Sequence, residues 1–359
     1  MAFFYILSVI LLVIFTASFI IAITTTIQSD YSNVSIPPGV NHPGKLRIVL
    51  AFMISTSAMG KILEKMGVCT KIAFTRYMRS GRKLGPDPQL SLVDARFGRV
   101  PVRLYRPRAP SAGLRPGAIF FHGGGWLYCS IDSHENICRY IAKESESVVV
   151  SVGYRLAPEH KYPAAYEDCL NATIHFMRNT EHYGVDPARI SVCGDSAGGN
   201  LAAAVSQTLA GRSDLPKLRA QILIYPGLQA LDFNLPSYQQ NQGVPLLFRE
   251  RAAFFALQYL NGDASHMQEV LKGSHIPPDM RMKYRKWLPE SFILTCEYDV
   301  LRDDGLLYKK RLEDNGVRVT WYHLEDGFHG IMSLYGYRVL KFPSAKRGLD
   351  RIVKFLKGL

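Results

Sequence analysis

A serine lies at the centre of residues 194–198, whose sequence GDSAG has the form G-x-S-x-G. The mostly apolar residues 190–193 before it predict a short buried strand, and residues 201–209, rich in Ala and Leu, predict a helix. A serine on such a strand-to-helix turn is held in a strained backbone conformation with its Oγ exposed. The alternative is a purely structural glycine turn, but the strand and helix on either side favour a nucleophile. We therefore interpret Ser196 as a nucleophile.

A second motif could stabilise the charge that such a nucleophile creates. Residues 122–126 (HGGGW) follow the apolar run 118–121, which predicts a core strand. Attack of a serine on a carbonyl builds negative charge on oxygen, and each preorganised donor at that point contributes about 3–4 kcal/mol. Consecutive glycines let backbone N–H groups approach a ligand closely, and the residue after the nucleophile, Ala197, supplies another N–H. An ordinary glycine-rich turn would explain the glycines but not His122.

A serine nucleophile needs a base that a third group orients. Residues 291–296 and 317–322 predict strands, with Asp299 shortly after the first and His329 in the loop after the second. Catalytic groups collect at the carboxyl ends of such strands, and the expected chain order is serine, acid, histidine. We therefore expect Asp299 to be the acid and His329 the base.

Other acids and one other histidine lie nearby in the sequence. Asp303 and Asp304 should lie on the start of a helix, where they would cap it. Asp326 lies only three residues before His329, and His323 lies inside the predicted strand rather than on a loop.

The elements around these residues predict one large α/β domain. The chain has 359 residues, of which 47% are hydrophobic, enough for one core with a cap. Short apolar strands alternate with helical stretches, which favours a mostly parallel eight-stranded sheet with helices on both faces. The first two strands are separated by two residues and should form an antiparallel hairpin. The predicted strands are 91–97, 100–105, 118–121, 148–152, 190–193, 220–225, 291–296 and 317–322.

Together the motifs resemble a known family. HGGGW, residues 154–159 (YRLAPE), GDSAGGN and residues 299–304 (DVLRDD) are similar to the hormone-sensitive-lipase group of α/β-hydrolases. With its apolar N-terminus, the chain most resembles the arylacetamide deacetylase family, in particular its deacetylase-like members. The resemblance runs from about residue 85 to the C-terminus.

The resemblance implies an α/β-hydrolase fold and a membrane-anchored serine hydrolase. Its triad would be Ser196, Asp299 and His329, working through an acyl-enzyme. The oxyanion donors would be Gly123, Gly124 and Ala197, with His122 and Gly125 completing the loop motif. A cap would be built from about residues 30–88 and 228–290. Lipophilic acyl esters or acetylated arylamines would be the substrates, and no cofactor or metal is implied.

A catalytically silent protein that binds a small ligand is the alternative on the same fold, as in the plant gibberellin receptors that resemble this group. Such a protein would be expected to lack the histidine or another member of the triad. This chain keeps all three residues and the HGGGW segment, residues 122–126, which we call the glycine loop. Both favour the enzyme, although a fold alone does not determine function.

The first 29 residues predict a membrane anchor. Residues 2–29 contain no charged side chain, and about 20 apolar residues span a bilayer as a helix. A cleaved signal peptide usually has a basic start and a shorter apolar core, so we expect an uncleaved single-pass anchor followed by the hydrolase domain, residues 30–359. Residues 46–66 should form a cap helix instead of a second span.

Two signals disagree on the side of the membrane that the domain occupies. Lys45 and Arg47 follow the anchor and no basic side chain precedes it, so the positive-inside rule favours the cytoplasm. The family resemblance implies the lumen of the endoplasmic reticulum. Asn171-Ala172-Thr173 is a glycosylation acceptor on a predicted helix, 164–177, whose polar stripe should expose Asn171. We expect the luminal orientation.

The remaining composition adds little about function. The net charge of +13 comes partly from the clusters 76–83, 281–286 and 309–311, which should be solvated or rest on anionic headgroups. The sequence contains no recognised nucleic-acid-binding module and no Cys or His spacing typical of zinc. The six cysteines allow one disulfide, for which Cys69 in the cap would be a candidate.

Overall fold

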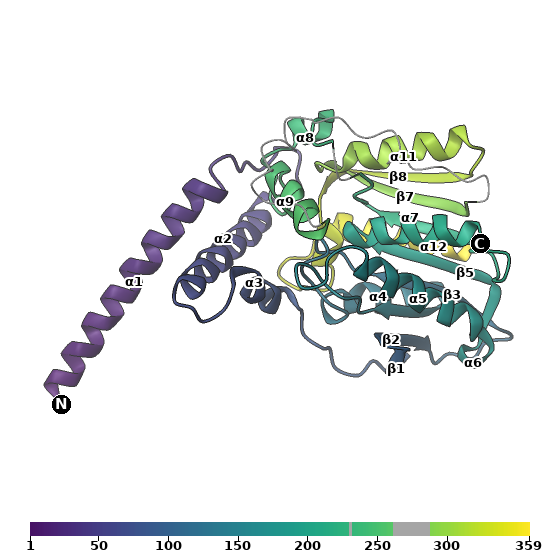
Figure 1. Cartoon of the computed structure of the whole chain (residues 1–359), viewed down its shortest axis with the longest axis horizontal. Helices are drawn as coiled ribbons and strands as arrows, with labels where there is room; N and C mark the ends of the chain where they lie inside the picture. The colour runs from purple at the N-terminus through teal and green to yellow at the C-terminus, as the bar shows by residue number, and fades with distance from the viewer. Residues whose placement is uncertain (230–231, 261–287) are drawn as a thin grey trace.

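The computed structural model describes residues 1–229, 232–260 and 288–359. These residues form an eight-stranded sheet with the order β1-β2-β4-β3-β5-β6-β7-β8 (Figure 1). β1 pairs antiparallel with β2, and β2 with β4, while all later neighbours are parallel. The predicted α/β fold and edge hairpin are confirmed. The strands are β1 (Leu90–Phe97), β2 (Val100–Pro107), β3 (Arg115–Phe121), β4 (Val148–Val152), β5 (Val185–Asp195), β6 (Ala220–Ile224), β7 (Glu290–Tyr298) and β8 (Val319–Phe328).

Helices cover both faces of this sheet. Central strands such as β4 and β6 are buried at every residue, as expected for parallel strands between two helical layers. On one face α4 (Glu135–Ser145) packs beside α12 (Pro343–Lys357), and their apolar side chains share one core cluster. On the other face lie α5 (Ala164–Arg178), α7 (Ala197–Ala210) and α11 (Arg302–Asp314). The short helix α6 (Thr180–Tyr183) leads into β5.

Further helices lie near the carboxyl ends of the parallel strands, where the predicted site residues are found (Figure 1). They are α2 (Pro43–Lys65), α3 (Lys71–Arg79), α8 (Pro236–Gln240) and α9 (Arg249–Tyr259). They fall within the two ranges, 30–88 and 228–290, from which we predicted a cap. Within the second range, residues 230–231 and 261–287 lie outside the described residues, as does the predicted basic cluster 281–286. The division into anchor, domain and cap stays a prediction.

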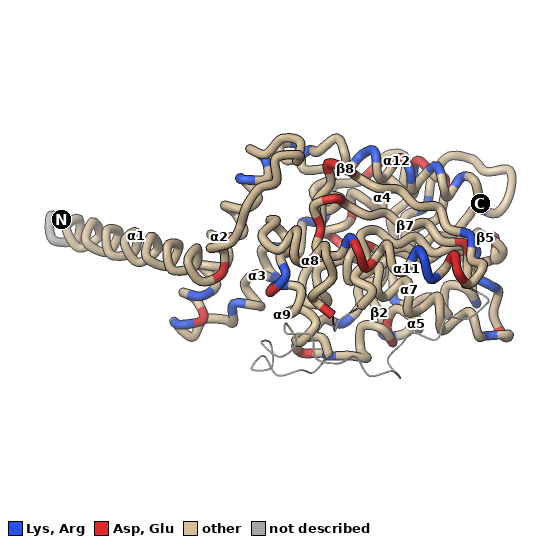
Figure 2. Tube along the Cα trace, turned by 90° about the horizontal axis from the view of Figure 1, so that it is seen from above, with Lys and Arg blue, Asp and Glu red and all other residues tan. Residues whose placement is uncertain are grey.

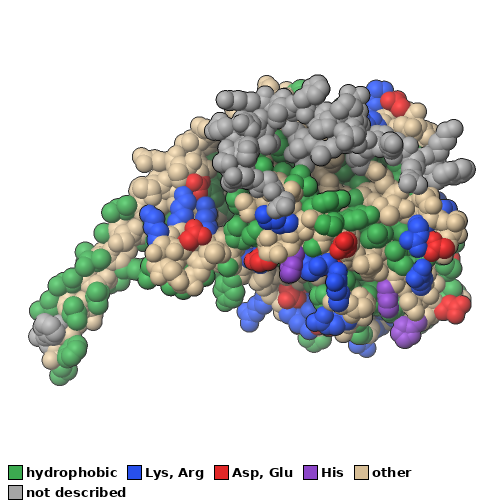
Figure 3. Space-filling view, in the orientation of Figure 1, with side chains coloured by type: hydrophobic (Ala, Val, Ile, Leu, Met, Phe, Trp, Pro, Cys, Tyr) green, Lys and Arg blue, Asp and Glu red, His purple; other side chains and the backbone are tan. Residues whose placement is uncertain are grey.

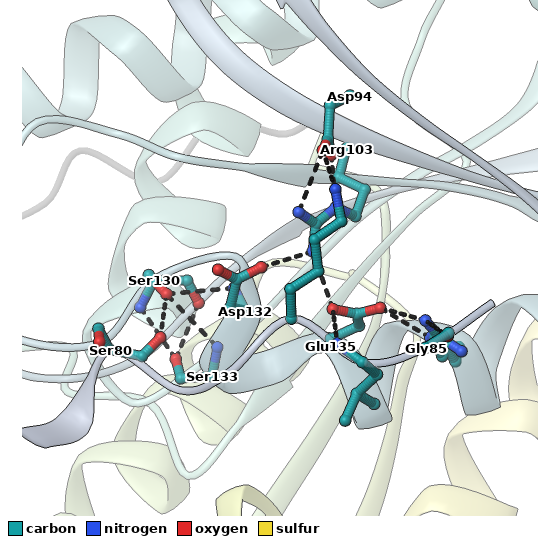
Figure 4. Close-up of polar contacts among 11 residues, drawn as sticks. Ser80, Gly85, Asp94, Arg103, Ser130, Asp132, Ser133 and Glu135 are labelled. Atoms are coloured by element: carbon teal, nitrogen blue, oxygen red, sulfur yellow. Dashed lines mark hydrogen bonds and ion pairs between the residues drawn. The ribbon is translucent and has the colours of Figure 1, made fainter.

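A buried arginine fastens the sheet edge to the segment that follows the glycine loop. Arg103 on β2 donates from Nη1 to Asp132 at 2.6 Å and to Glu135 at 2.8 Å, and from Nε to Asp94 at 2.5 Å. Figure 4 shows these three carboxylates around the one guanidinium. A buried charge is tolerated when it is paired in this way. The network therefore holds residue 132 and the start of α4 against β1 and β2.

The N-terminal helix α1 (Ala2–Asp30) projects away from this body (Figure 1). Its residues 4–18 are exposed, and Figure 3 shows hydrophobic side chains over its surface. Charged residues begin only at its C-terminal end (Figure 2), where Asp30 pairs with Lys61 at 2.9 Å and Lys71 at 3.1 Å. These ion pairs join α1 to α2 and α3.

Two described helices are long and apolar enough to cross a membrane, spanning Phe4–Asp30 and Pro43–Lys65. The first lies clear of the protein core. The second, α2, buries Leu46 and Val49 against the domain, and its role as the cap helix that we predicted over 46–66 stays a prediction.

Candidate active site

Ser196 lies on the sharp turn that the G-x-S-x-G pattern predicts. β5 ends at Asp195 and α7 begins at Ala197, so the serine alone connects the strand to the helix. Its backbone has φ 56° and ψ −119°, a conformation that is strained for any residue with a Cβ. The Ser196 N–H donates to the Ile224 carbonyl of β6 at 2.9 Å, which helps to hold the strained turn.

The flanking glycines are required because the turn packs directly against neighbouring backbone. A Cβ on Gly198 would lie 1.9 Å from the Phe121 carbonyl oxygen at the end of β3. A Cβ on Gly194 would lie 2.2 Å from the Gly198 carbonyl oxygen. Both distances are far inside van der Waals contact, so only glycine allows α7 to start this close to the glycine loop that follows β3.

The structure brings the three expected triad side chains together. His329 Nε2 lies 2.9 Å from Ser196 Oγ, and His329 Nδ1 lies 2.8 Å from Asp299 Oδ2. Asp299 is fully buried and His329 is 7% exposed. In the tautomer with the proton on Nδ1, His329 would donate to the Asp299 carboxylate and Nε2 would face the serine hydroxyl.

Each partner lies directly at the end of its strand. Asp299 follows β7, which ends at Tyr298, and His329 follows β8, which ends at Phe328. β8 is six residues longer at this end than the predicted strand 317–322, so His329 follows the strand without an intervening loop. The extended strand continues beside β7, where Tyr298 and Phe328 are paired. Because Asp299 and His329 each follow one member of this pair, they lie next to each other at the same end of the sheet.

Backbone contacts hold the acid in place. Asp299 Oδ1 accepts from the Leu301 N–H at 2.8 Å. The side-chain amide of Asn241 donates to the carbonyls of Glu297 and Asp299, each at 3.1 Å. Asn241 follows α8, so a residue from the predicted cap region braces the loop that carries the acid. Nothing in the spacing of the sequence indicated this contact.

The competing acids have other partners. Asp326 accepts from Ser344 at 2.5 Å and pairs with Arg347 at 2.7 Å. Asp303 and Asp304 lie in the first turn of α11 as predicted, but they do not cap that helix. Asp303 accepts from the Ser237 N–H at 2.8 Å, and Asp304 accepts from the Leu228 N–H at 3.1 Å. The expectation of capping was wrong because these carboxylates accept from the backbone of Ser237 and Leu228 and so fasten that segment to the start of α11.

The glycine loop differs from expectation at its first glycine. The Gly123 N–H donates to Asp195 Oδ1 at 2.8 Å, so it is not available to an oxyanion and the assignment of Gly123 as a donor is wrong. Within the described part of the chain, the N–H groups of Gly124, Gly125 and Ala197 donate to no other residue. Gly124 and Gly125 have φ values of 116° and 64°, which glycine adopts without strain.

Behind the loop lies a buried polar cluster that the motifs alone did not reveal. Asp195 lies 3.1 Å from His134 Nε2. Although burial favours the neutral acid, His134 and the Gly123 N–H hold the pKa of Asp195 below its ordinary value. The only signal in the sequence was an acidic residue at the variable position of G-x-S-x-G.

His122 is part of the same cluster. Burial, with a smaller effect from His134, lowers its pKa to about 4. Its Nδ1 lies 2.8 Å from the Gly123 carbonyl, and the Tyr154 hydroxyl donates to the His122 carbonyl at 2.6 Å. His122 is thus a neutral, buried residue that supports the glycine loop through its contacts with Gly123 and Tyr154.

Helices α9 and α3 cover the outer side of the loop. Trp126 stacks on Tyr259 of α9 with ring centroids 4.5 Å apart. On α3, Arg76 donates to the Leu127 carbonyl at 2.9 Å and to the Ala157 carbonyl at 2.8 Å. The loop is therefore fixed from both sides.

Two further expectations concern residues away from the triad. Asn171 is exposed on α5, as its place on the helix predicts. All six cysteines are free thiols, and five are buried, so the disulfide considered for Cys69 is not formed.

Comparisons with known proteins agree with this architecture. A sequence profile of the α/β-hydrolase fold matches residues 118–333. Human arylacetamide deacetylase-like 4 is 42% identical, with 90% of this chain and 92% of that protein covered. Mouse arylacetamide deacetylase is 33% identical, with 88% and 94% covered. A hyperthermophilic esterase from the archaeon Pyrobaculum calidifontis has a TM-score of 0.67 at 30% identity, covering 89% of this chain and 98% of that one. The chain belongs to the arylacetamide deacetylase family of α/β-hydrolases.

Proposed function

We propose that this protein is a membrane-anchored serine hydrolase that cleaves lipophilic acyl esters or acetylated arylamines through an acyl-enzyme. The observation that carries this proposal is the unbroken chain of contacts from Asp299 through His329 to Ser196, at 2.8 Å and 2.9 Å. The names of its relatives, which include deacetylases and esterases, support an acyl substrate.

The proposed reaction begins with proton transfer from Ser196 Oγ to His329 Nε2 while Oγ bonds to the carbonyl carbon of the substrate. The carbonyl oxygen becomes negatively charged, and we assign its donors as the N–H groups of Gly124, Gly125 and Ala197. The imidazolium, stabilised by Asp299, then protonates the departing alcohol or amine. A water that His329 deprotonates releases the acid from the serine by the same steps.

The N–H groups of Gly124 and Gly125 suit this role better than that of Gly123 because they have no partner within the described residues. α7 also starts at Ala197, so the positive end of its helix dipole lies beside the reacting carbonyl. The Gly123 N–H instead ties the loop to the nucleophile turn through Asp195.

The non-catalytic alternative would use the same fold to hold a ligand without reaction. The strained Ser196 conformation favours the enzyme, since such strain is retained where function needs it. A protein that only binds would have no need for an aligned nucleophile and base.

The proposed membrane anchor is α1, as a single span. Polar side chains on it bond within the helix: Ser8 donates to the Phe4 carbonyl at 2.8 Å and Thr16 to the Leu12 carbonyl at 2.7 Å. This is how hydroxyl groups are accommodated in lipid. The apolar window of α1 has no buried residue, and its ion pairs to α2 and α3 lie at its C-terminal residue, Asp30. We place this end close to the membrane surface, from which lipophilic substrates could reach the domain. We propose the endoplasmic reticulum as its location and the lumen as its side.

A fluorophosphonate probe tests the nucleophile. We expect covalent labelling of Ser196 in the full-length protein and hydrolysis of 4-nitrophenyl butyrate, both lost in Ser196→Ala. The exposed Ser213→Ala, on the loop after α7, is the matched control and should keep both. Labelling that persists in Ser196→Ala would place the nucleophile elsewhere.

A further inference from the structure

Arg251, at the start of α9, carries a buried guanidinium nitrogen, Nη1, that has no hydrogen-bond partner among the residues that the structure describes. Among the buried, unpartnered side-chain polar atoms of residues 1–229, 232–260 and 288–359, Arg251 Nη1 is the only one on a charged side chain. A buried cation without a counter-charge is costly. Arg103 shows the usual solution, since it is buried and surrounded by three carboxylates (Figure 4).

The position of Arg251 relates it to the glycine loop. Arg251, Phe255 and Tyr259 recur at i, i+4 and i+8, so they lie along one face of α9. Tyr259 stacks on Trp126, and the Phe255 ring is so near the loop that a Cβ on Gly125 would lie 2.4 Å from it. That face of α9 therefore packs against the glycine loop next to Gly125, one of the residues that we assign as oxyanion donors.

The guanidinium lies one helical turn from this contact. Its central carbon is 5.5 Å from the Phe255 ring centroid and 6.0 Å from that of Phe248. The Phe255 ring is thus a shared neighbour of the Arg251 guanidinium and of Gly125, and it relates the positive charge to the glycine loop. Contacts with aromatic faces and with the Tyr31 side chain hold the group in place, but among the described residues Nη1 has no acceptor.

A second guanidinium lies nearby on α3. The central carbon of Arg79 is 5.4 Å from the Tyr128 ring, and Tyr128 meets Phe255 edge-on at 5.7 Å. Within the part of the chain that the structure describes, neither Arg79 nor Arg251 forms an ion pair with a carboxylate. Burial lowers the pKa of Arg251, and the charge on Arg79 also lowers it. Arg251 and Arg79 therefore repel each other, and an anion on a bound ligand would neutralise this repulsion.

We propose that Arg251, assisted by Arg79, binds a carboxylate or phosphate group on the substrate whose ester bond Ser196 cleaves. This inference rests on the proposed hydrolase function and narrows its substrates to acyl esters that also carry a negative charge. A guanidinium suits this task because its planar donors match the geometry of carboxylate and phosphate oxygens.

Matched ester pairs that differ only in charge test the proposal. On the acyl side the pair is mono-4-nitrophenyl adipate and its neutral methyl ester. On the alcohol side it is 4-acetoxybenzoate and its methyl ester, with 4-acetoxyphenyl phosphate as the phosphate-bearing probe. The full-length protein is compared with Arg251→Met, Arg251→Lys and Arg79→Met. Arg351→Met is the control, because Arg351 also lies over a ring, that of Tyr322, but is exposed on α12.

In Arg251→Met we expect kcat/KM for the anionic member of at least one pair to fall about 10–100-fold, with the neutral member changed less than twofold. Arg251→Lys should lose less, Arg79→Met should lose in the same direction, and Arg351→Met should match the wild type. The thermal midpoint of each Arg251 variant is measured in parallel, because the substitution also removes the contact of the guanidinium with the Tyr31 side chain. Equal changes for the charged and neutral members of every pair would overturn the proposal.

A binding measurement separates this proposal from the proposed function. The same charged and neutral esters are titrated into full-length Ser196→Ala, with and without Arg251→Met, by calorimetry. If the wild type hydrolyses no ester but the charged members still bind in an Arg251-dependent manner, the hydrolase function fails and the anion site stands. If hydrolysis occurs and binding does not depend on Arg251, the anion site fails alone.

Discussion

The Gly123 N–H donates to the Asp195 carboxylate at 2.8 Å, so the residue before the proposed nucleophile holds the first glycine of the glycine loop. The two residues are 72 positions apart in the chain. The carboxylate is in turn paired with buried His134. Through this contact the loop after β3 and the turn after β5, which carry the proposed oxyanion donors, are kept at a set separation.

Asp195→Asn tests this link. The amide can still accept from Gly123, but the partner of His134 loses its charge. We expect kcat to fall roughly 10–100-fold, since a displaced oxyanion donor costs about 3–4 kcal/mol at most, with a smaller change in KM. We also expect a loss of about 3 kcal/mol of stability. Asp186→Asn, at the other end of β5, is the control. Wild-type turnover in Asp195→Asn would contradict the role of the link.

Asp299→Asn tests the identity of the triad acid. A neutral amide can keep the fold but disfavours the tautomer in which His329 accepts the serine proton, so we expect turnover to fall roughly 10²–10⁴-fold. Asp303→Asn and Asp326→Asn should cost far less in rate, because their carboxylates bind Ser237 and Arg347. Turnover and thermal midpoint are measured in parallel. An inactive Asp326→Asn beside an active Asp299→Asn would move the acid to the last loop.

His122 should make the fold sensitive to mild acid. Its pKa is lowered from 6.5 to about 4, so between these values the unfolded chain binds a proton that the folded protein does not. The stability that this residue contributes is present above pH 6.5 and is lost as the pH falls towards 4, by on the order of 3 kcal/mol. The fall in thermal midpoint over this range should therefore be smaller in His122→Asn than in the wild type. The exposed His160→Asn should behave as the wild type. Parallel pH curves for wild type and His122→Asn would refute the assignment.

Glycosylation at Asn171 tests the orientation of the domain. Asn171 is exposed on α5, so an enzyme domain in the lumen can receive a glycan there. Endoglycosidase treatment should increase the gel mobility of the wild type, and Asn171→Gln should show no shift. Protease added outside sealed microsomes should leave the domain intact. Complete digestion would instead support the cytoplasmic orientation that the charge rule favours.

The sequence predicted much of the frame on which the site is built. Each of the eight expected strands is present, because a buried parallel strand is a short apolar run whose signal is local. The predicted ends were less accurate: the last strand extends to Phe328 instead of residue 322. That end depends on pairing with β7, which only the assembled sheet supplies.

By itself the sequence determined which residues are candidates for the chemistry. Ser196, Asp299 and His329 could be selected because the motif and the strand ends that carry them are local patterns, and the apolar character of α1 is local in the same sense. The tertiary structure alone decided which polar groups are already occupied. It committed the Gly123 N–H to Asp195 and gave Asp303 and Asp304 partners at Ser237 and Leu228. Among the described residues it left Arg251 Nη1 without a partner. Each of these outcomes depends on hydrogen bonds between segments far apart in the chain, and a pattern of residue types does not specify how such segments share their donors and acceptors.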